Sequence, residues 1–191
     1  MKLAKLIRVV TVPPVMALWL ILTLRLDRSG YFPCPVSFWA ALFFLTVLPL
    51  LAYPLSALLP PLKARGREGQ RDLAMGLSVL GYLGGWLFGR FGPCGQPLLF
   101  IFGTYLFSVL TLLVFNKLLR LRASGHACSV AGPALCLLYL QGGWWTPVCI
   151  GVYAASFWAS VRTGRHSPRE YLLGTLSVLI AMGLAWLVWR P

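Results

Sequence analysis

Seven apolar stretches, each near the length of a membrane-spanning helix and separated by short polar loops, constrain the fold of this chain. Lipid offers no hydrogen-bond partner to backbone groups, so a stretch that crosses a membrane must be helical. We therefore expect one all-α domain over residues 1–191, a polytopic membrane helical bundle of six to seven transmembrane helices. The stretches cover approximately Leu6–Leu24, Ser37–Leu59, Leu73–Gly89, Leu98–Phe115, Ala127–Leu140, Val148–Val161 and Tyr171–Trp189.

The composition agrees with a membrane protein. Hydrophobic residues make up 59% of the chain and the mean hydropathy is +0.78, which is more apolar surface than a soluble domain can bury. The first apolar stretch is followed by Arg25 and Asp27 rather than by a small-residue cleavage site. This favours a retained span over a removed signal peptide, and we expect a multi-pass protein of the cell (plasma) membrane.

Prolines and glycines indicate the shape of two of the expected helices. Pro13–Pro14 interrupts the backbone hydrogen bonds of the first stretch and should bend it. Gly81, Gly84 and Gly85 in the third stretch predict close packing against a neighbouring helix.

The formal net charge of +13 predicts how the helices are oriented. No nucleic-acid-binding module is visible, so the charge indicates contact with membrane lipids and their anionic headgroups rather than with nucleic acid. With seven spans, the N-terminus and the loops at 61–72, 116–126 and 160–170 share one side, and the positive-inside rule places that side in the cytoplasm. Both histidines of the chain lie in loops on this basic side. The other side holds Arg25, Arg28, Arg90 and Arg190.

His166 and Glu170 stand four residues apart at the start of the seventh stretch. On a helix this spacing puts them on one face, where the carboxylate can accept one ring proton and leave the other nitrogen as nucleophile or base. The segment Ser167–Glu170 is also a capping box with proline at the first helical position, which explains Glu170 equally well. The two roles are compatible.

The loop before the fifth stretch holds the other histidine. Lys117, Arg122, Ser124 and Gly125 are candidate phosphate ligands, because glycine permits close backbone approach and a helix N-terminus favours an anion. A basic loop with a capping serine is the alternative. His126 fits that alternative poorly, because placing a histidine at the start of a membrane helix costs free energy and is expected only where the histidine has a function.

Two histidines, one carboxylate and several arginines on one membrane face suit phosphoryl transfer without a metal. One histidine attacks phosphorus, the other protonates the leaving oxygen, and the cations hold the equatorial oxygens. The same arginines would repel a divalent ion, so we expect neither a metal nor a cofactor.

This pattern resembles that of the type 2 phosphatidic acid phosphatase superfamily, the membrane-embedded lipid phosphate phosphatases, over most of the chain from the basic loop onward. That family has a Ser-Gly-His motif opening one helix and an Arg-x5-His-x3-Asp motif opening a later helix. Ser124, Gly125 and His126 match the first motif. His166 matches the histidine of the second, and Glu170 stands in place of its aspartate. The resemblance implies that His166 forms a phosphohistidine, that Glu170 orients it and that His126 protonates the leaving group.

The sequence departs from the family at its cationic positions. Ser160 stands where the family has arginine, and we expect Arg162 or Arg165 to supply the charge and bind phosphate. The Lys-x6-Arg-Pro motif is absent, and Lys117 with Arg122 is its nearest substitute.

The basic, glycine-bearing loop at 61–72 is a second candidate for anion binding. Lys63, Arg67 and Arg71, together with Asn116, could bind a diphosphate or an anionic headgroup. A solvated positive-inside loop explains the same residues.

These features predict a membrane enzyme that hydrolyses a lipid phosphate. The reaction would be metal-independent hydrolysis of a phosphomonoester or diphosphate, such as a prenyl diphosphate or a phosphatidate-like molecule. Two alternatives stay open. One is a non-catalytic lipid-binding membrane protein with a degenerate phosphatase site. The other is a phosphotransferase that uses the same residues to pass the phosphoryl group to an alcohol.

Overall fold

The computed structural model describes residues 1–27 and 30–188, apart from the side chain of Arg67. Within these residues the protein is helical and has no strand. Each predicted apolar stretch is mostly helical, with breaks at Thr11–Val12 in the first stretch and at Leu51 in the second; Arg28, Trp189 and Arg190 lie outside the described residues. The elements are α1 (Lys2–Val10), α2 (Pro13–Leu26), α3 (Pro35–Leu42), η1 (Phe43–Val47), α4 (Leu48–Leu50), α5 (Ala52–Leu58), α6 (Pro60–Ala64), α7 (Gly66–Phe91), α8 (Gln96–Leu113), η2 (Val114–Leu118), α9 (Gly125–Gln141), η3 (Gly143–Trp145), α10 (Thr146–Arg162) and α11 (Pro168–Val188).

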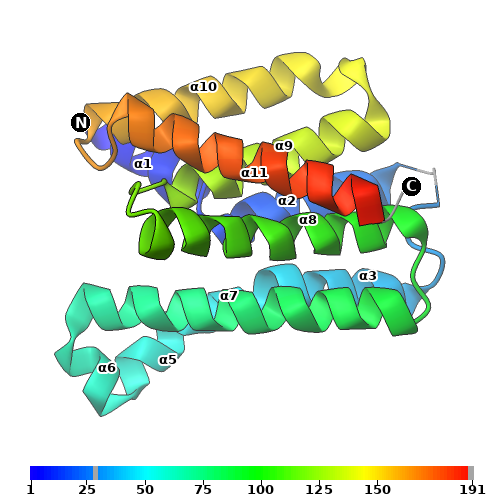
Figure 1. The fold of residues 1–191 in the computed structure, drawn as a ribbon, viewed down its shortest axis with the longest axis horizontal. Helices are drawn as coiled ribbons and strands as arrows, with labels where there is room; N and C mark the ends of the chain where they lie inside the picture. Colours follow the sequence, from blue (N-terminus) through cyan, green and yellow to red (C-terminus); the bar gives the residue numbers. More distant parts are fainter. Residues whose placement is uncertain (28–29, 189–191) are drawn as a thin grey trace.

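The long helices run side by side along the length of the molecule (Figure 1). α8 packs against α7, α9 and α11, and α2 packs against α9. The main apolar core fills the space between these helices, with Leu20, Phe100, Phe102 and Leu137 buried in it. Burial of such side chains stabilises each helix pair through tight van der Waals packing, because lipid tails are as apolar as the side chains and burial from lipid gives no hydrophobic gain.

Three helical segments are long and apolar enough to cross a membrane. They are Pro35–Leu58, Gln96–Leu118 and Pro168–Val188, and the bent pair α1 and α2 makes a fourth if it counts as one span. Among the described residues this is fewer than the six to seven predicted. α9 and α10 have 17 residues each, so each rises about 26 Å, whereas the hydrocarbon core is about 30 Å thick. α7 is longer, but its first two turns are mostly polar.

The first apolar stretch forms two helices, α1 and α2, in place of one continuous helix. α1 and α2 are bent by 58° relative to each other. Val12 has an extended backbone, which is the conformation favoured before proline, and α2 begins at Pro13. The predicted bend at Pro13–Pro14 is therefore confirmed. It directs α1 against α10.

The glycines of α7 lie where two neighbouring helices approach closely. A Cβ atom at Gly81 would be 2.5 Å from the carbonyl oxygen of Phe44, and one at Gly85 would be 2.6 Å from the ring of Phe102. The predicted close packing is confirmed. Gly81 packs against η1, and Gly85 packs against α8.

The two histidine-bearing loops lie at one end of the bundle, which we call the histidine end. The N-terminus, the start of α7, the connection from η2 to α9 and the connection from α10 to α11 all gather there, at the left in Figure 1. The connections from α7 to α8 and from α9 to α10 lie at the opposite end. The expectation that both histidines share one end with the basic loop is confirmed.

Candidate active site

A direct backbone contact joins the two histidine loops. The N–H of Ser124 donates to the carbonyl oxygen of Glu170 at 2.9 Å, and the Ser124 hydroxyl caps α9 by accepting from the N–H of Ala127 at 3.2 Å. Gly174 makes this approach possible, because a Cβ atom there would lie 2.2 Å from the carbonyl oxygen of Ser124. The start of α9 is thus held against the first turns of α11.

Glu170 combines the two roles that its sequence context left open. Its Oε2 lies 3.4 Å from Nδ1 of His166 and accepts from the N–H of Ser167 at 3.1 Å. The Ser167 hydroxyl in turn accepts from the N–H of Glu170 at 3.2 Å, which completes the capping box. Because Nδ1 faces a carboxylate, the proton of the neutral His166 ring lies on Nδ1 and the lone pair on Nε2.

Arg122 reaches the same carboxylate from the other loop. Its Nε is 3.4 Å from Oε1 of Glu170, although the arginine side chain is largely exposed. Arg122 has a φ of 52°, a left-handed conformation that is uncommon for a residue with a side chain. The loop is also held by Asn116, whose Nδ2 donates to the carbonyl oxygen of Ala123 at 3.1 Å. Asn116, predicted as a possible headgroup ligand, therefore has a structural contact in this loop.

His126 lies in the first turn of α9 against a group of hydroxyls that sequence reasoning did not identify. Its Nε2 is 3.1 Å from Oγ1 of Thr11 and 3.2 Å from Oγ of Ser156. The Thr11 hydroxyl donates to the carbonyl oxygen of Ile7 at 2.7 Å, so it can only accept from the histidine. The O–H of Tyr171 donates to Ser156 Oγ at 2.9 Å. This arrangement puts the proton of neutral His126 on Nε2 and the lone pair on Nδ1.

Both histidines are neutral at pH 7. Burial lowers the pKa of His126 to about 4, and the positive charge of Arg8, together with that of His166 whenever His166 is protonated, acts in the same direction. Burial is also the largest cause that lowers the pKa of His166, where the hydrogen bond to Glu170 opposes it and Arg8 reinforces it. Each ring therefore keeps an unprotonated nitrogen.

Arg8 belongs to this site, although the sequence analysis did not include it. Its Nη1 donates to Oγ of Ser160 at 3.0 Å across 152 positions of sequence. Ser160 is fully buried near the end of α10, whereas Arg162 and Arg165, expected to supply charge there, are exposed. No local spacing reveals Arg8, because it reaches the site through the bend between α1 and α2 and the packing of α1 on α10.

The other predicted ligands lie around the site or apart from it. Gly125 begins α9 and has open space where a Cβ would stand, while Lys117 is exposed in η2. Lys63 and Arg71 are exposed near the start of α7, and no hydrogen bond or ion pair joins them to the histidine loops in the described part of the chain. The side chain of Arg67 lies outside the described residues.

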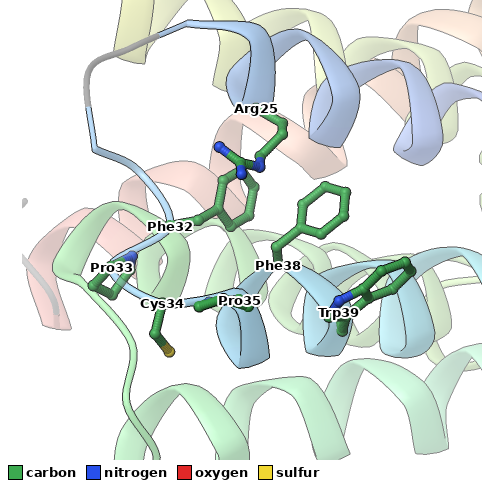
Figure 2. Close-up of a pocket in the computed structure, with 7 residues that line it drawn as sticks. All are labelled: Arg25, Phe32, Pro33, Cys34, Pro35, Phe38 and Trp39. Carbon is green, nitrogen blue, oxygen red and sulfur yellow. The ribbon is translucent and has the colours of Figure 1, made fainter.

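Two pockets of the described structure lie away from the histidine end. One of about 290 Å³ lies where α2 is followed by α3, and Figure 2 shows Arg25 among the aromatic rings that line it. The Arg25 guanidinium lies 5.7 Å from the ring centroid of Phe38. This pocket contains neither histidine nor any other predicted site residue.

Chemically, the histidine end offers two neutral imidazoles, one carboxylate and two arginines that reach into it. Across residues 1–27 and 30–188, no group of three or more His, Cys, Asp or Glu side chains is arranged to hold a metal ion. No protein-family model matches the chain, and neither a curated protein nor a solved structure matches it.

Proposed function

We propose that this protein is a membrane-embedded hydrolase of lipid phosphates or diphosphates, with its active site at the histidine end. One observation carries the proposal. The loop of His166 and Glu170 and the loop of Arg122 and His126 lie together at the histidine end. A nucleophile oriented by a carboxylate, a second imidazole and cations are the groups that phosphoryl transfer needs.

In the first proposed step, Nε2 of His166 attacks phosphorus and the bond from phosphorus to the leaving oxygen breaks. Glu170 stabilises the positive charge that develops on the ring through Nδ1–H. The leaving oxygen takes a proton from His126, and the alcohol or phosphate departs. In the second step, water attacks phosphorus, gives a proton to His126, and the phosphorus–nitrogen bond breaks to release inorganic phosphate and restore His166.

Substrate binding would favour protonation of His126. Burial is the largest cause of its low pKa and the positive charge of Arg8 adds to it; a bound phosphate dianion offsets the Arg8 charge and raises the pKa. Its Nδ1 carries the lone pair, so this nitrogen would exchange the proton with the substrate. Arg122 would hold phosphate oxygens, while the exposed Lys117, Arg162 and Arg165 would attract the anionic headgroup.

The lipid tail would lie along the apolar helices, with its headgroup at the histidine end. In this proposal α7, α9 and α10 also cross the bilayer of the plasma membrane, because α9 and α10 pack on each other and α9 and α7 pack on candidate spans. The many Lys and Arg residues at the histidine end would place it in the cytoplasm.

The test is phosphate release by the purified full chain from a panel of lipid phosphates, including phosphatidate and a prenyl diphosphate. We expect turnover that a metal chelator leaves unchanged and that His166→Ala abolishes without unfolding the protein. Hydrolysis of the same substrates by the His166→Ala variant at the unaltered rate would contradict the proposal.

A lipid-phosphate-binding protein without turnover is the second candidate. It is favoured by the contacts of His126, whose Nε2 is held by interior hydroxyls. In that case the purified protein in detergent would bind the same lipids and release no phosphate from them. Transfer of labelled phosphate to an added alcohol instead of to water would identify a phosphotransferase.

A further inference from the structure

Arg8 is a half-buried cation without a carboxylate partner in the described part of the chain. Its Nη1 donates to the neutral hydroxyl of Ser160, and the ion pairs that the structure describes involve other residues. A guanidinium has five N–H donors, so one bond to a hydroxyl leaves donors to spare. A half-buried charge in this state is costly unless an anion accompanies it.

The surroundings of Arg8 add positive charge instead of balancing it. Arg165 lies near enough for its charge to act on Arg8, and the charge of Arg8 acts on both histidines. The carboxylate of the histidine loops, Glu170, is already shared between Arg122 and His166. The site without ligand therefore lacks negative charge beside Arg8.

Ser160 gives the arginine a fixed position. It is fully buried in α10, and its hydroxyl accepts from Nη1 at 3.0 Å. α1 itself packs on α10, which brings the guanidinium to the same end as His126 and His166. A serine at this position leaves room for a guanidinium that comes from another helix.

We propose that Arg8, positioned by Ser160, binds the phosphate group at the histidine site, so that α1 is part of the binding site. The assignment of the phosphate to a lipid substrate rests on the function proposed above. Binding of the phosphate group itself does not depend on turnover. A guanidinium matches phosphate in two parallel hydrogen bonds, which a lysine cannot reproduce.

The experiment measures the affinity of the full chain in detergent for inorganic phosphate, by calorimetry, for matched variants. Arg8→Gln should weaken phosphate binding by about 10- to 100-fold, the loss typical of a charged hydrogen bond. Lys5→Gln, an exposed lysine of the same helix, should leave it unchanged. Equal affinity in Arg8→Gln and the unmodified chain, or an equal loss in Lys5→Gln, would overturn the inference.

Charge relocation provides an independent check. Adding Ser160→Arg to Arg8→Gln returns a guanidinium to the space that Arg8 occupied, and phosphate affinity should recover. If Arg8→Gln does not fold, Ser160→Ala is used in its place, because it keeps the charge of Arg8 and removes the hydroxyl that positions it. We expect Ser160→Ala to reduce phosphate affinity, and unchanged affinity would contradict the inference.

A chain that binds phosphate through Arg8 and hydrolyses no lipid phosphate contradicts the proposed function alone. A chain that hydrolyses lipid phosphate while Arg8→Gln changes neither affinity nor turnover contradicts this inference alone.

Discussion

Glu170 serves a helix cap and a histidine at once, and substitutions can separate these roles. In Glu170→Gln the side-chain oxygen can still accept from Ser167, but the negative charge beside His166 is lost. We expect turnover to fall about 100-fold, within the range for general acid–base groups, with little change in stability. Ser167→Ala is the matched control. It removes the hydroxyl that accepts from the Glu170 N–H and should lower stability by about 1 kcal/mol while turnover is kept. If both variants lose turnover equally, Glu170 acts as a cap alone.

The pH dependence of turnover follows from the lowered pKa of His166. Attack needs the neutral ring, so the loss of kcat/KM that protonation of His166 causes should appear only below the ordinary histidine pKa of 6.5. Removing the Arg8 charge takes away one cause of the lowering, so the acid limb of the Arg8→Gln profile should move to higher pH. A kcat/KM profile with the same acid limb in both proteins would contradict this electrostatic account.

The contact between α9 and α11 depends on one glycine, which makes it testable by a pair of substitutions in a single helix. A methyl group at Gly174 would meet the Ser124 carbonyl oxygen, while one at Gly183 meets open space. Gly174→Ala should therefore lower the free energy of unfolding by about 1–3 kcal/mol, the cost typical of overpacking. It should also reduce turnover, because it separates the histidine loops. Gly183→Ala should keep stability and turnover, or raise stability slightly through better helix propensity. Thermal unfolding in detergent measures the first effect, and full retention of stability in Gly174→Ala would contradict the described packing.

The orientation of the whole bundle predicts which loops share a side of the membrane. In a Cys34→Ser/Cys94→Ser background, cysteines introduced at Arg165 and at Trp144 mark the two ends of α10. If α10 crosses the bilayer, a membrane-impermeant maleimide added to right-side-out vesicles should label Trp144→Cys and leave Arg165→Cys unlabelled until the membrane is opened. Labelling of both from the outside would show that α10, with its 17 residues, does not cross.

The sequence predicted features that depend on neighbouring residues and missed those that depend on distant ones. Helical stretches, the bend at Pro13–Pro14 and the capping box at Ser167–Glu170 follow from apolar length, missing N–H groups and fixed spacing. The contact between Arg8 and Ser160 follows from the direction in which α1 leaves the bend, which no local pattern encodes. The hydroxyls around His126 come from three different helices or their ends and were missed for the same reason.

Trapping of the covalent intermediate tests the central claim most directly. The purified chain is mixed with a lipid phosphate labelled at phosphorus, and the reaction is quenched in alkaline detergent. Alkaline conditions are used because phosphohistidine is stable in them. The account predicts label on the peptide that contains His166, and none on the His166→Ala variant prepared in parallel. Release of phosphate with no labelled protein, or label that persists in His166→Ala, would contradict it.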